Sequence, residues 1–401
     1  MSYYTPASRG TRRNEISRRA AGIPASGIRR FFDLIAGVEG VISLGVGEPD
    51  FVTPVGIRNA AIRAIEEGHT HYTSNFGLPE LREAVSRHLE RRYGVSYDPT
   101  RELLITTGVS EGLNIALAAL LDPGDEVVGA DPSYVAYLPV TMLAGGVYVP
   151  VPTTVENGFK MRAEDVEAHV SPRTKAILIG YPANPTGAVM EREDLLALAE
   201  IVERHDLFVV SDEIYDRLVY GVEHTCFAAL PGMRERTVLL GGFSKAYAMT
   251  GWRVGWLAAR PDVLGAAMVV HQYVMMSAPT VAQYAALEAL NSAEEDVRGM
   301  LAEYDRRRRL VVDALNDMDL TCFEPRGAFF AFPNVSVTGL NDAEFSEKLL
   351  KEEKVAVVPG SAFGSGGRNH VRICYAQPIE RIEVALERMR NFVDRHRPAA
   401  K

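Results

Sequence analysis

The fold is decided by a short apolar run that ends in acidic residues, Leu207-Phe208-Val209-Val210-Ser211-Asp212-Glu213. Four consecutive apolar residues followed by polar ones predict a strand over Leu207–Val210 that is buried on both faces of a sheet. Runs of the same kind occur on either side of it in the chain. The other predicted strands are Leu103–Thr107, Glu126–Ala130, Ala176–Ile179 and Val238–Leu240.

The segments between these strands have the spacing of helices, for example Leu113–Leu121 and Arg192–Arg204. Strands that alternate with helices predict crossover connections onto a mostly parallel sheet with helices on both faces. We therefore predict an α/β fold whose large domain comprises residues 51–299.

After residue 300 the pattern changes to that of a smaller α+β domain. The predicted elements are a charged helix with the run Arg306–Arg309, a β-rich stretch at Gly327–Phe332, a polar helix over Asp342–Lys351, strands at Val355–Val358 and Val371–Tyr375, and a last helix from near Pro378. We assign residues 300–401 to this domain, together with an N-terminal arm in residues 1–50. The arginine run is expected to be a solvated helix face rather than an RNA-binding patch.

The composition is that of a globular protein, because 47% of the 401 residues are apolar and 24% are charged. A formal charge of −9 argues against nucleic acid as a partner. Cys226, Cys322 and Cys374 have neither zinc-site nor disulfide spacing, so we predict no metal site and a cytoplasmic location. The uncharged segment Val263–Leu287 is predicted to be a buried helix interrupted near Pro279, not a membrane span.

Two of the predicted strands are followed by small and amide-bearing residues, at the sheet edge where open α/β sheets bind ligands. Thr107-Gly108-Val109-Ser110 opens a helix, and the backbone N–H groups of a helix start can bind an anion. Asn184-Pro185-Thr186-Gly187 follows the strand Ala176–Ile179. Taken alone, the first motif is an ordinary glycine turn before a helix and the second is an ordinary loop turn.

Two further strand ends carry charged residues. A carboxylate such as Asp212 at the end of a buried strand is costly unless it caps a helix or meets a cation, for example a protonated ring nitrogen. Lys245 lies among small and apolar residues, where a lysine has a lowered pKa and can attack a carbonyl group. Arg253 can return to the same region as a clamp for phosphate or carboxylate. The alternative is a surface lysine beside a structural arginine. Together the four strand ends supply what pyridoxal phosphate needs.

In the order and spacing of its motifs, the chain resembles the class I and II aminotransferases, which are pyridoxal-phosphate enzymes of fold type I. The resemblance extends over nearly the whole chain. The blocks that carry it are Ile28 to Asp33, Ser43 to Phe51, Tyr72-Thr73, Gly77 to Arg82, Asn184 to Gly187, Ser244 to Gly255, Pro325 to Phe330 and Val371-Arg372-Ile373.

The resemblance implies a catalytic role for three residues. Lys245 would hold the cofactor as a Schiff base and then shuttle protons, and Asp212 would face the pyridine nitrogen. Tyr215, together with Asn184, would hydrogen-bond the ring hydroxyl oxygen. Tyr134 would stack on the ring, and the alternative is an ordinary core tyrosine.

The resemblance also implies the residues that hold phosphate and substrate. The phosphate-binding residues would be Gly108, Val109, Ser110, Ser244 and Arg253 of one subunit and Tyr72 of the neighbouring subunit. Gly47 would let the substrate approach the backbone, and Arg372 would bind its α-carboxylate unless it is a surface-paired strand arginine. Many relatives have a serine three residues before the lysine, and here that position is Gly242, so Ser244 is the expected replacement.

An aminotransferase of this family implies a ping-pong reaction between an amino acid and a 2-oxo acid such as 2-oxoglutarate, in a homodimer with shared active sites. Some aspartate-specific relatives have a lysine for the distal carboxylate of the substrate at about the position of Ala118. The absence of this lysine argues against a dedicated aspartate enzyme, so we favour aromatic or neutral amino acids. Ile28, Phe31 and Tyr273 are candidates for an apolar pocket or for ordinary core packing.

Two other functions remain open. A β-lyase acting on sulfur amino acids would use the same lysine and aspartate. A non-catalytic regulator that binds pyridoxal phosphate would need a DNA-binding module, for which the roughly thirty residues before the first matching block are too few.

Overall fold

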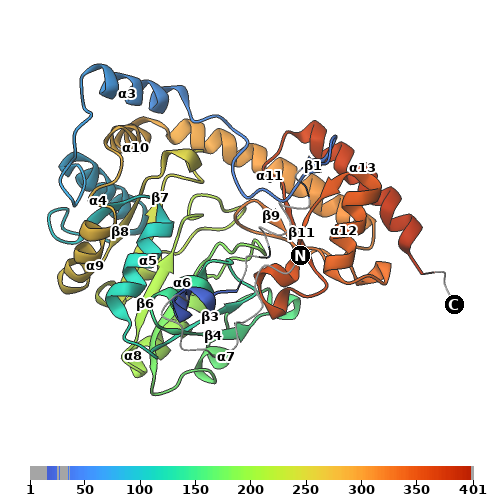
Figure 1. The fold of residues 1–401 in the computed structure, drawn as a ribbon, viewed down its shortest axis with the longest axis horizontal. Coiled ribbons are helices and arrows are strands. Elements are labelled where there is room, and N and C mark those ends of the chain that lie inside the picture. The colour runs from blue at the N-terminus through green and yellow to red at the C-terminus, as the bar shows by residue number, and fades with distance from the viewer. Residues whose placement is uncertain (1–15, 25–26, 28–34, 36, 399–401) are drawn as a thin grey trace.

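The computed structural model describes residues 16–24, 27, 35 and 37–398, and its centre is a seven-stranded sheet (Figure 1). In spatial order the strands are β2 (Leu103–Thr106), β8 (Gly255–Ala258), β7 (Thr237–Gly242), β6 (Phe208–Asp212), β5 (Thr174–Ile179), β3 (Glu126–Asp131) and β4 (Val147–Pro152). β8 is antiparallel to its neighbours β2 and β7, and the other neighbouring pairs are parallel. The predicted α/β sheet is confirmed, and each of its five predicted strands is present.

Two strands of this sheet, β4 and β8, are not predicted by the sequence pattern. β4 contains Pro150 and Pro152, which normally argue against a strand, but it is the last strand of the sheet, where proline is tolerated. β8 is only four residues long and follows the loop that carries Arg253. Prolines within β4, and the short length of β8 with its glycine, leave patterns too weak to be recognised before the sheet is known.

Helices cover both faces of the sheet because alternate residues of each strand point to opposite sides. In β6, Val210 belongs to a core with Leu113 of α5 (Val109–Leu120) and with α9 (Pro261–Val274). Val209 belongs instead to a core with α8 (Arg192–Arg204). The remaining helices of this part of the chain are α3 (Val55–Glu66), α4 (Pro79–Tyr93), α6 (Tyr137–Leu143), α7 (Ala163–Glu167) and α10 (Thr280–Ser292).

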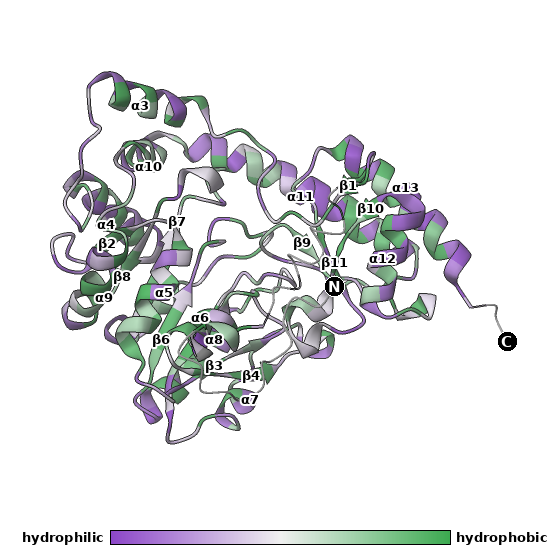
Figure 2. Ribbon diagram, in the orientation of Figure 1, coloured by the Kyte–Doolittle hydropathy of each residue, from purple (hydrophilic) through white to green (hydrophobic). Residues whose placement is uncertain are grey.

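The second part of the molecule is the predicted mixture of short strands and helices. β1 (Ile42–Ser43) pairs with β10 (Val355–Ala356), and β11 (Val358–Pro359), β12 (Val371–Cys374) and β9 (Phe330–Ala331) form an antiparallel sheet. α12 (Asp342–Glu353) packs on α13 (Ile379–His396) through an edge-to-face contact between Phe345 and Phe392, with ring centroids 5.2 Å apart. Figure 2 shows hydrophilic and hydrophobic residues alternating along α13, whose apolar side faces this core.

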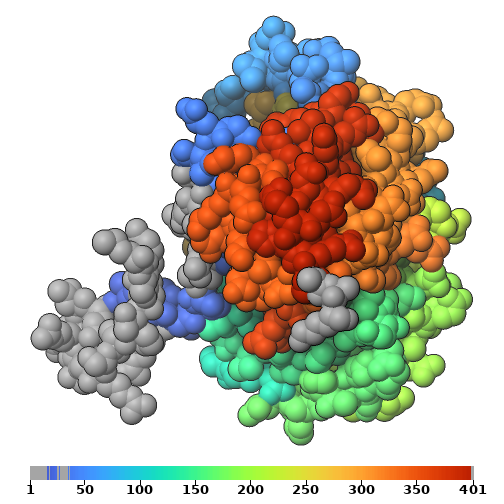
Figure 3. Space-filling view, turned by 90° about the vertical axis from the view of Figure 1, so that its right-hand side faces the viewer, coloured from blue at the N-terminus to red at the C-terminus, as the bar shows by residue number. Residues whose placement is uncertain are grey.

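The two parts pack directly against each other. Figure 3 looks at the side formed by the C-terminal residues, in orange and red, which rest on the green part of the chain from the middle of the sequence. A 24-residue helix, α11 (Glu294–Asp317), contains the predicted domain boundary between residues 299 and 300. Most of the predicted N-terminal arm lies outside the described residues, apart from short pieces such as α1 (Arg18–Ala21).

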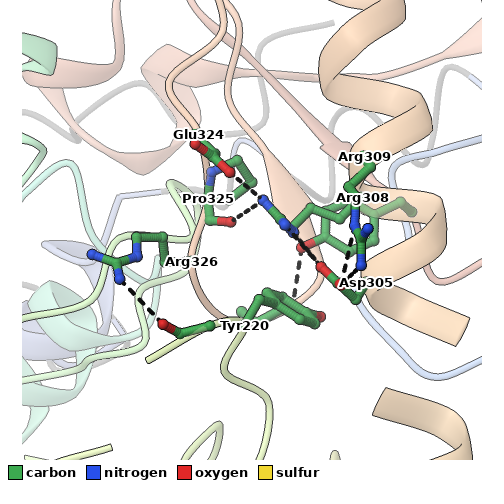
Figure 4. A network of polar contacts seen from close by, with 10 residues as sticks. Tyr220, Asp305, Arg308, Arg309, Glu324, Pro325 and Arg326 are labelled. Carbon is green, nitrogen blue, oxygen red and sulfur yellow. Dashed lines mark hydrogen bonds and ion pairs between the residues drawn. The ribbon is translucent and has the colours of Figure 1, made fainter. Parts of the chain in front are cut away.

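The arginine run on α11 is only half solvated, so the expectation of an exposed face is wrong for two of its members. Arg306 and Arg309 are exposed, whereas Arg307 and Arg308 are buried. Residues 304, 307, 308 and 311 follow helical spacing and face the interior. Arg308 is neutralised there by Asp305 and Glu324 and also donates to the Pro325 carbonyl (Figure 4). Arg307 pairs with Asp50 and Glu303.

The uncharged segment 263–287 forms two helices, as predicted, with Pro279 as the N-cap of α10. Its burial is incomplete, however, because Val269, Tyr273, Val274, Met275 and Met276 on and after α9 are exposed. In the described part of the chain, no helix is both long enough and apolar enough to cross a membrane.

Candidate active site

The carboxyl ends of neighbouring parallel strands bring the predicted polar motifs to one edge of the sheet. β6 and β7 pair directly, so that Asp212 at the end of β6 lies opposite Leu240 and the chain beyond β7 reaches Lys245 within a few residues. β5 leads to Asn184, and β2 ends at the turn before Gly108. Segments that are more than a hundred residues apart thus meet at this edge because parallel strands present the same end there.

Lys245 is half-buried, and its Nζ atom donates a hydrogen bond of 2.7 Å to the carbonyl oxygen of Gly47. The rings of Phe329 and Tyr215 lie 5.6 and 5.8 Å from Nζ. Burial, reinforced by the charges of Arg372 and Arg253, lowers the pKa of Lys245 to about 8. About a tenth of this lysine is therefore a neutral, nucleophilic amine at pH 7, far more than for a lysine with the ordinary pKa.

Asp212 is buried at the end of β6 with a hydrogen bond from the Tyr137 hydroxyl to Oδ2, at 3.0 Å, and one from the Ile214 N–H to Oδ1, at 3.3 Å. Burial raises its pKa to about 6, although both hydrogen bonds and Lys245 act in the opposite direction. A carboxylate held in this way stabilises a cation placed beside it.

Tyr137 is a site residue that the sequence analysis missed. It is the first residue of α6, three positions after Tyr134, and its ring meets the Tyr134 ring edge to face at 5.5 Å. Burial raises the pKa of Tyr137 far above its usual value, so the hydroxyl stays protonated and donates a hydrogen bond to Asp212. The only local signal is the spacing of the two tyrosines after Asp131, and that spacing does not indicate which strand end they face.

The start of α5 forms a small concave turn with Arg253 beside it. Gly108 caps the helix with φ 86°, and Val109 and Ser110 are the first two helical residues. The positive φ favours glycine at this position, and a Cβ atom here would lie 2.7 Å from the Arg253 guanidinium and displace it. The guanidinium is held by the carbonyls of Thr250, at 2.8 Å, and Thr107, at 3.3 Å, and is otherwise exposed. Free helix N–H groups beside a cation suit a phosphate.

Arg372 is a buried cation without a buried anion. It donates to Asn184 Oδ1 at 2.8 Å and to the Gly45 carbonyl at 2.6 Å, and it lies against the rings of Phe330 and Phe363. It is 3% exposed, its Nε atom has no partner in the described part of the chain, and no carboxylate of that part pairs with it. The alternative of a strand arginine paired at the surface is therefore wrong.

Gly47 lies between Lys245 and Arg372. Its carbonyl accepts the lysine hydrogen bond, and a Cβ atom at this position would be 3.2 Å from the Phe330 ring and 3.6 Å from Arg372. Because Lys245 and Arg372 approach the same glycine, a small molecule with a carboxylate can be held by Arg372 next to the lysine amine.

The other predicted residues lie in different settings. Tyr215 is buried, and burial raises its pKa, so its hydroxyl stays protonated. Tyr134 is half-buried and Ser244 is buried next to Lys245. Tyr72 is 80% exposed, which places it at the surface of this chain.

Two of the residues invoked for substrate choice, Ala118 and Tyr273, are exposed at the surface of this chain. Ala118 is exposed near the far end of α5, roughly 14 Å along the helix axis from Val109. Tyr273 is 83% exposed, so it is not packed into a core of the described part of the chain. Ile28 and Phe31 lie outside the described residues.

The site as a whole fits pyridoxal phosphate on the chemistry of its groups. A nucleophilic amine suits the aldehyde, a buried carboxylate suits the ring cation, and a helix start with an arginine suits the phosphate. The buried, anion-free Arg372 is left to bind a carboxylate of a second molecule. The fold and this combination of groups are those of a pyridoxal-phosphate enzyme.

Comparison with known proteins identifies the family. A family model described as aminotransferase class I and II matches residues 39–389. A Bacillus subtilis protein named as an aminotransferase, YugH, is 53% identical over 92% of this chain and 96% of its own length. An aspartate aminotransferase of Pyrococcus abyssi is 45% identical over 93% of this chain and 97% of its own. The solved aromatic aminotransferase of Pyrococcus horikoshii superposes with a TM-score of 0.88 at 43% identity, over 91% of this chain and 99% of its own. The chain belongs to the class I and II aminotransferases and is a pyridoxal-phosphate-dependent aminotransferase.

Proposed function

We propose that this enzyme moves the amino group of an aromatic or neutral L-amino acid to a 2-oxo acid such as 2-oxoglutarate, in a ping-pong sequence. The observation that carries the proposal is Arg372, a buried cation with no carboxylate of the described chain beside it, next to the glycine that Lys245 also contacts. An α-carboxylate bound there places the substrate amino group and Cα near the lysine amine.

In this proposal Lys245 Nζ would hold the aldehyde carbon of pyridoxal phosphate and, once displaced by the substrate amine, would take the proton from the substrate Cα and deliver it to that carbon of the cofactor. The cofactor supplies an electron sink that makes this proton acidic. Asp212, fixed by Tyr137, pairs with the protonated ring nitrogen and keeps it charged. Because Asn184 Oδ1 faces Arg372, its Nδ2 amide is the group that donates to the ring hydroxyl oxygen. Tyr215 donates to the same oxygen and Tyr134 stacks on the ring.

The phosphate is assigned to the N–H groups of Gly108, Val109 and Ser110 and to the guanidinium of Arg253. Ser244 would take the place of the serine that many relatives have at the position of Gly242. Its position immediately before Lys245 supports this assignment. The glycine at 242 is itself tightly packed, because a Cβ atom would lie 3.2 Å from the Gly255 backbone.

We further propose a homodimer in which Tyr72 reaches the partner's phosphate. Tyr72 is 80% exposed, and the carbonyl of the preceding residue, His71, accepts a hydrogen bond of 2.7 Å from Thr280, four residues after the exposed apolar run Tyr273–Met276. Exposed apolar groups gathered in this way are typical of a subunit interface. The three cysteines are free and buried, which supports a cytoplasmic location.

The preference for aromatic or neutral donors is supported by the surroundings of Arg372. The guanidinium lies 4.5 Å from the Phe330 ring and 4.8 Å from the Phe363 ring, so the immediate neighbourhood of the carboxylate site is aromatic. Relatives named for aspartate and for aromatic amino acids are almost equally similar to this chain, so overall identity does not decide between them.

The test is the absorbance spectrum of the purified holoenzyme before and after single amino acids are added. We expect a band that borohydride treatment removes, converted by aromatic or neutral donors to the pyridoxamine form and restored by 2-oxoglutarate. Lys245→Ala is expected to fold and to lose this conversion. Conversion by aspartate alone would overturn the proposed donor class. Release of pyruvate and ammonia without a 2-oxo acid would identify a β-lyase instead.

A further inference from the structure

A buried pair of side chains, Glu111 and His271, lies directly behind the turn assigned to the phosphate. Glu111 is on the first turn of α5, and His271 is near the end of α9. His271 is completely buried, and its Nδ1 atom lies 2.6 Å from Glu111 Oε1. Its Nε2 atom has no partner in the described part of the chain, so the contact with Glu111 is the one hydrogen bond of this imidazole there.

The other oxygen of Glu111 holds the turn itself. Oε2 accepts a hydrogen bond from the Thr107 N–H at 2.5 Å and one from the Thr107 hydroxyl at 2.7 Å. On the opposite side, the Thr107 carbonyl accepts from Arg253 Nη2 at 3.3 Å. Thr107 is therefore clamped from both ends, and the next residue is Gly108, whose φ of 86° directs the chain into α5.

We propose that Glu111 and His271 are positioning residues for the cofactor phosphate: His271 orients the Glu111 carboxylate, and Glu111 fixes the Thr107–Gly108 turn with its N–H groups directed at the anion. This inference rests on the proposed assignment of the phosphate to this turn. Without His271, Oε1 of Glu111 would be buried without a hydrogen-bond donor. That desolvation is unfavourable, and the carboxylate would be free to rotate away from Thr107. Donors that are already oriented bind an anion without reorganisation, so the pair strengthens cofactor binding.

The experiment compares cofactor retention in holoenzymes that carry His271→Leu and His271→Asn. Leucine fills a similar volume without a donor, whereas the asparagine amide can place a donor close to the position of Nδ1. We expect the Kd for pyridoxal phosphate, measured by equilibrium dialysis with absorbance, to rise by about tenfold in His271→Leu, as for one lost hydrogen bond to a charged group. His271→Asn is expected to restore most of the affinity. With saturating cofactor, the KM for the amino acid should stay unchanged in both.

Leu264→Ala is the matched control, because Leu264 is buried on the same helix and belongs to the apolar core that α9 shares with α5. It is expected to lower thermal stability but to leave the Kd for pyridoxal phosphate unchanged. If His271→Leu does not fold, Glu111→Gln is measured instead and should also weaken cofactor binding. Unchanged Kd values in the variants, or an equal loss in Leu264→Ala, would overturn the positioning role. Failure of the wild-type protein to bind pyridoxal phosphate would overturn the proposed function itself.

Discussion

At Lys245 the chemistry depends on the pH at which the ammonium group loses its proton. Burial lowers this pKa to about 8, and the neutral amine is the form that attacks an aldehyde. We expect the rate of pyridoxal phosphate uptake by cofactor-free protein to rise about tenfold between pH 7 and pH 9 and then to level off. Stopped-flow absorbance over this range measures it. A rate that keeps rising up to pH 10.5 would mean that the lysine pKa is not lowered.

At Asp212 burial shifts the pKa in the opposite direction, from the usual 3.8 up to about 6. The folded, cofactor-free protein therefore binds this proton more tightly than the unfolded chain does. The free energy of unfolding is therefore expected to fall by roughly 3 kcal/mol as the pH rises from about 4 to about 6, and to stay at the lower value above pH 6. Asp212→Asn removes this dependence. Urea unfolding of both proteins between pH 4.5 and 7 tests it, and a stability difference that does not vary with pH would contradict the prediction.

Among the structural elements, β3 is attached to the C-terminal part of the molecule through one carboxylate at its end. Asp131 Oδ2 accepts from the Ser365 N–H at 3.1 Å and from its hydroxyl at 2.6 Å, and Oδ1 accepts from the Gly366 N–H at 3.1 Å. The same loop carries Phe363, whose ring lies 4.8 Å from the Arg372 guanidinium. Asp131 thus connects the central sheet to the residue that we propose to bind the substrate carboxylate.

We therefore expect Asp131→Ala to destabilise the protein by about 2–4 kcal/mol and to raise the KM for the amino acid severalfold, with a smaller change in kcat. Denaturant unfolding and steady-state kinetics measure the two effects. Glu126→Ala is the matched control, because Glu126 is a buried carboxylate at the opposite end of the same strand, bound to Ser171 and Arg173. It should reduce stability without affecting KM. Equal KM changes in both variants would refute a role for Asp131 in substrate binding.

Local pattern was sufficient for the long elements and insufficient for the short ones. The helix over Arg192–Arg204 was predicted with the bounds that it has, because its apolar residues follow one face. The start of α5 was predicted too, because Thr107-Gly108-Val109-Ser110 was expected to open a helix, and α5 begins at Val109. The edge strand β4 was missed, because Pro150 and Pro152 interrupt its pattern and it forms by pairing with β3.

For the whole molecule, the dimer proposal gives a direct test. Val274 on α9 is 60% exposed within the apolar group Tyr273–Met276, so Val274→Asp would bury a charge in the proposed interface. We expect this variant to be a monomer by light scattering and to lose most of its activity, because Tyr72 would no longer reach a partner's phosphate. Val384→Asp, on exposed residue 384 of α13, is the control and should leave the mass unchanged. A monomeric wild-type protein, or a fully active Val274→Asp monomer, would contradict shared active sites.

By itself, the sequence determined the alternation of strands and helices, and therefore the edge of the sheet to which Lys245, Asp212, Asn184 and Gly108 are brought. Parallel strands always present the same end at one edge, so motifs that follow strands can be assigned to it without coordinates. Their individual roles remain proposals.

Only the tertiary structure decided the contacts that join distant parts of the chain: Tyr137 with Asp212, His271 with Glu111, and Asp131 with Ser365. It also showed that Arg307 and Arg308 are buried beside acidic side chains. Arg372 is equally buried but has no acidic partner in the described part of the chain. The physical reason is that burial and pairing depend on what packs from elsewhere in the chain. The same arginine is a surface charge, a structural ion pair or a ligand-binding cation according to neighbours that its own sequence context does not name.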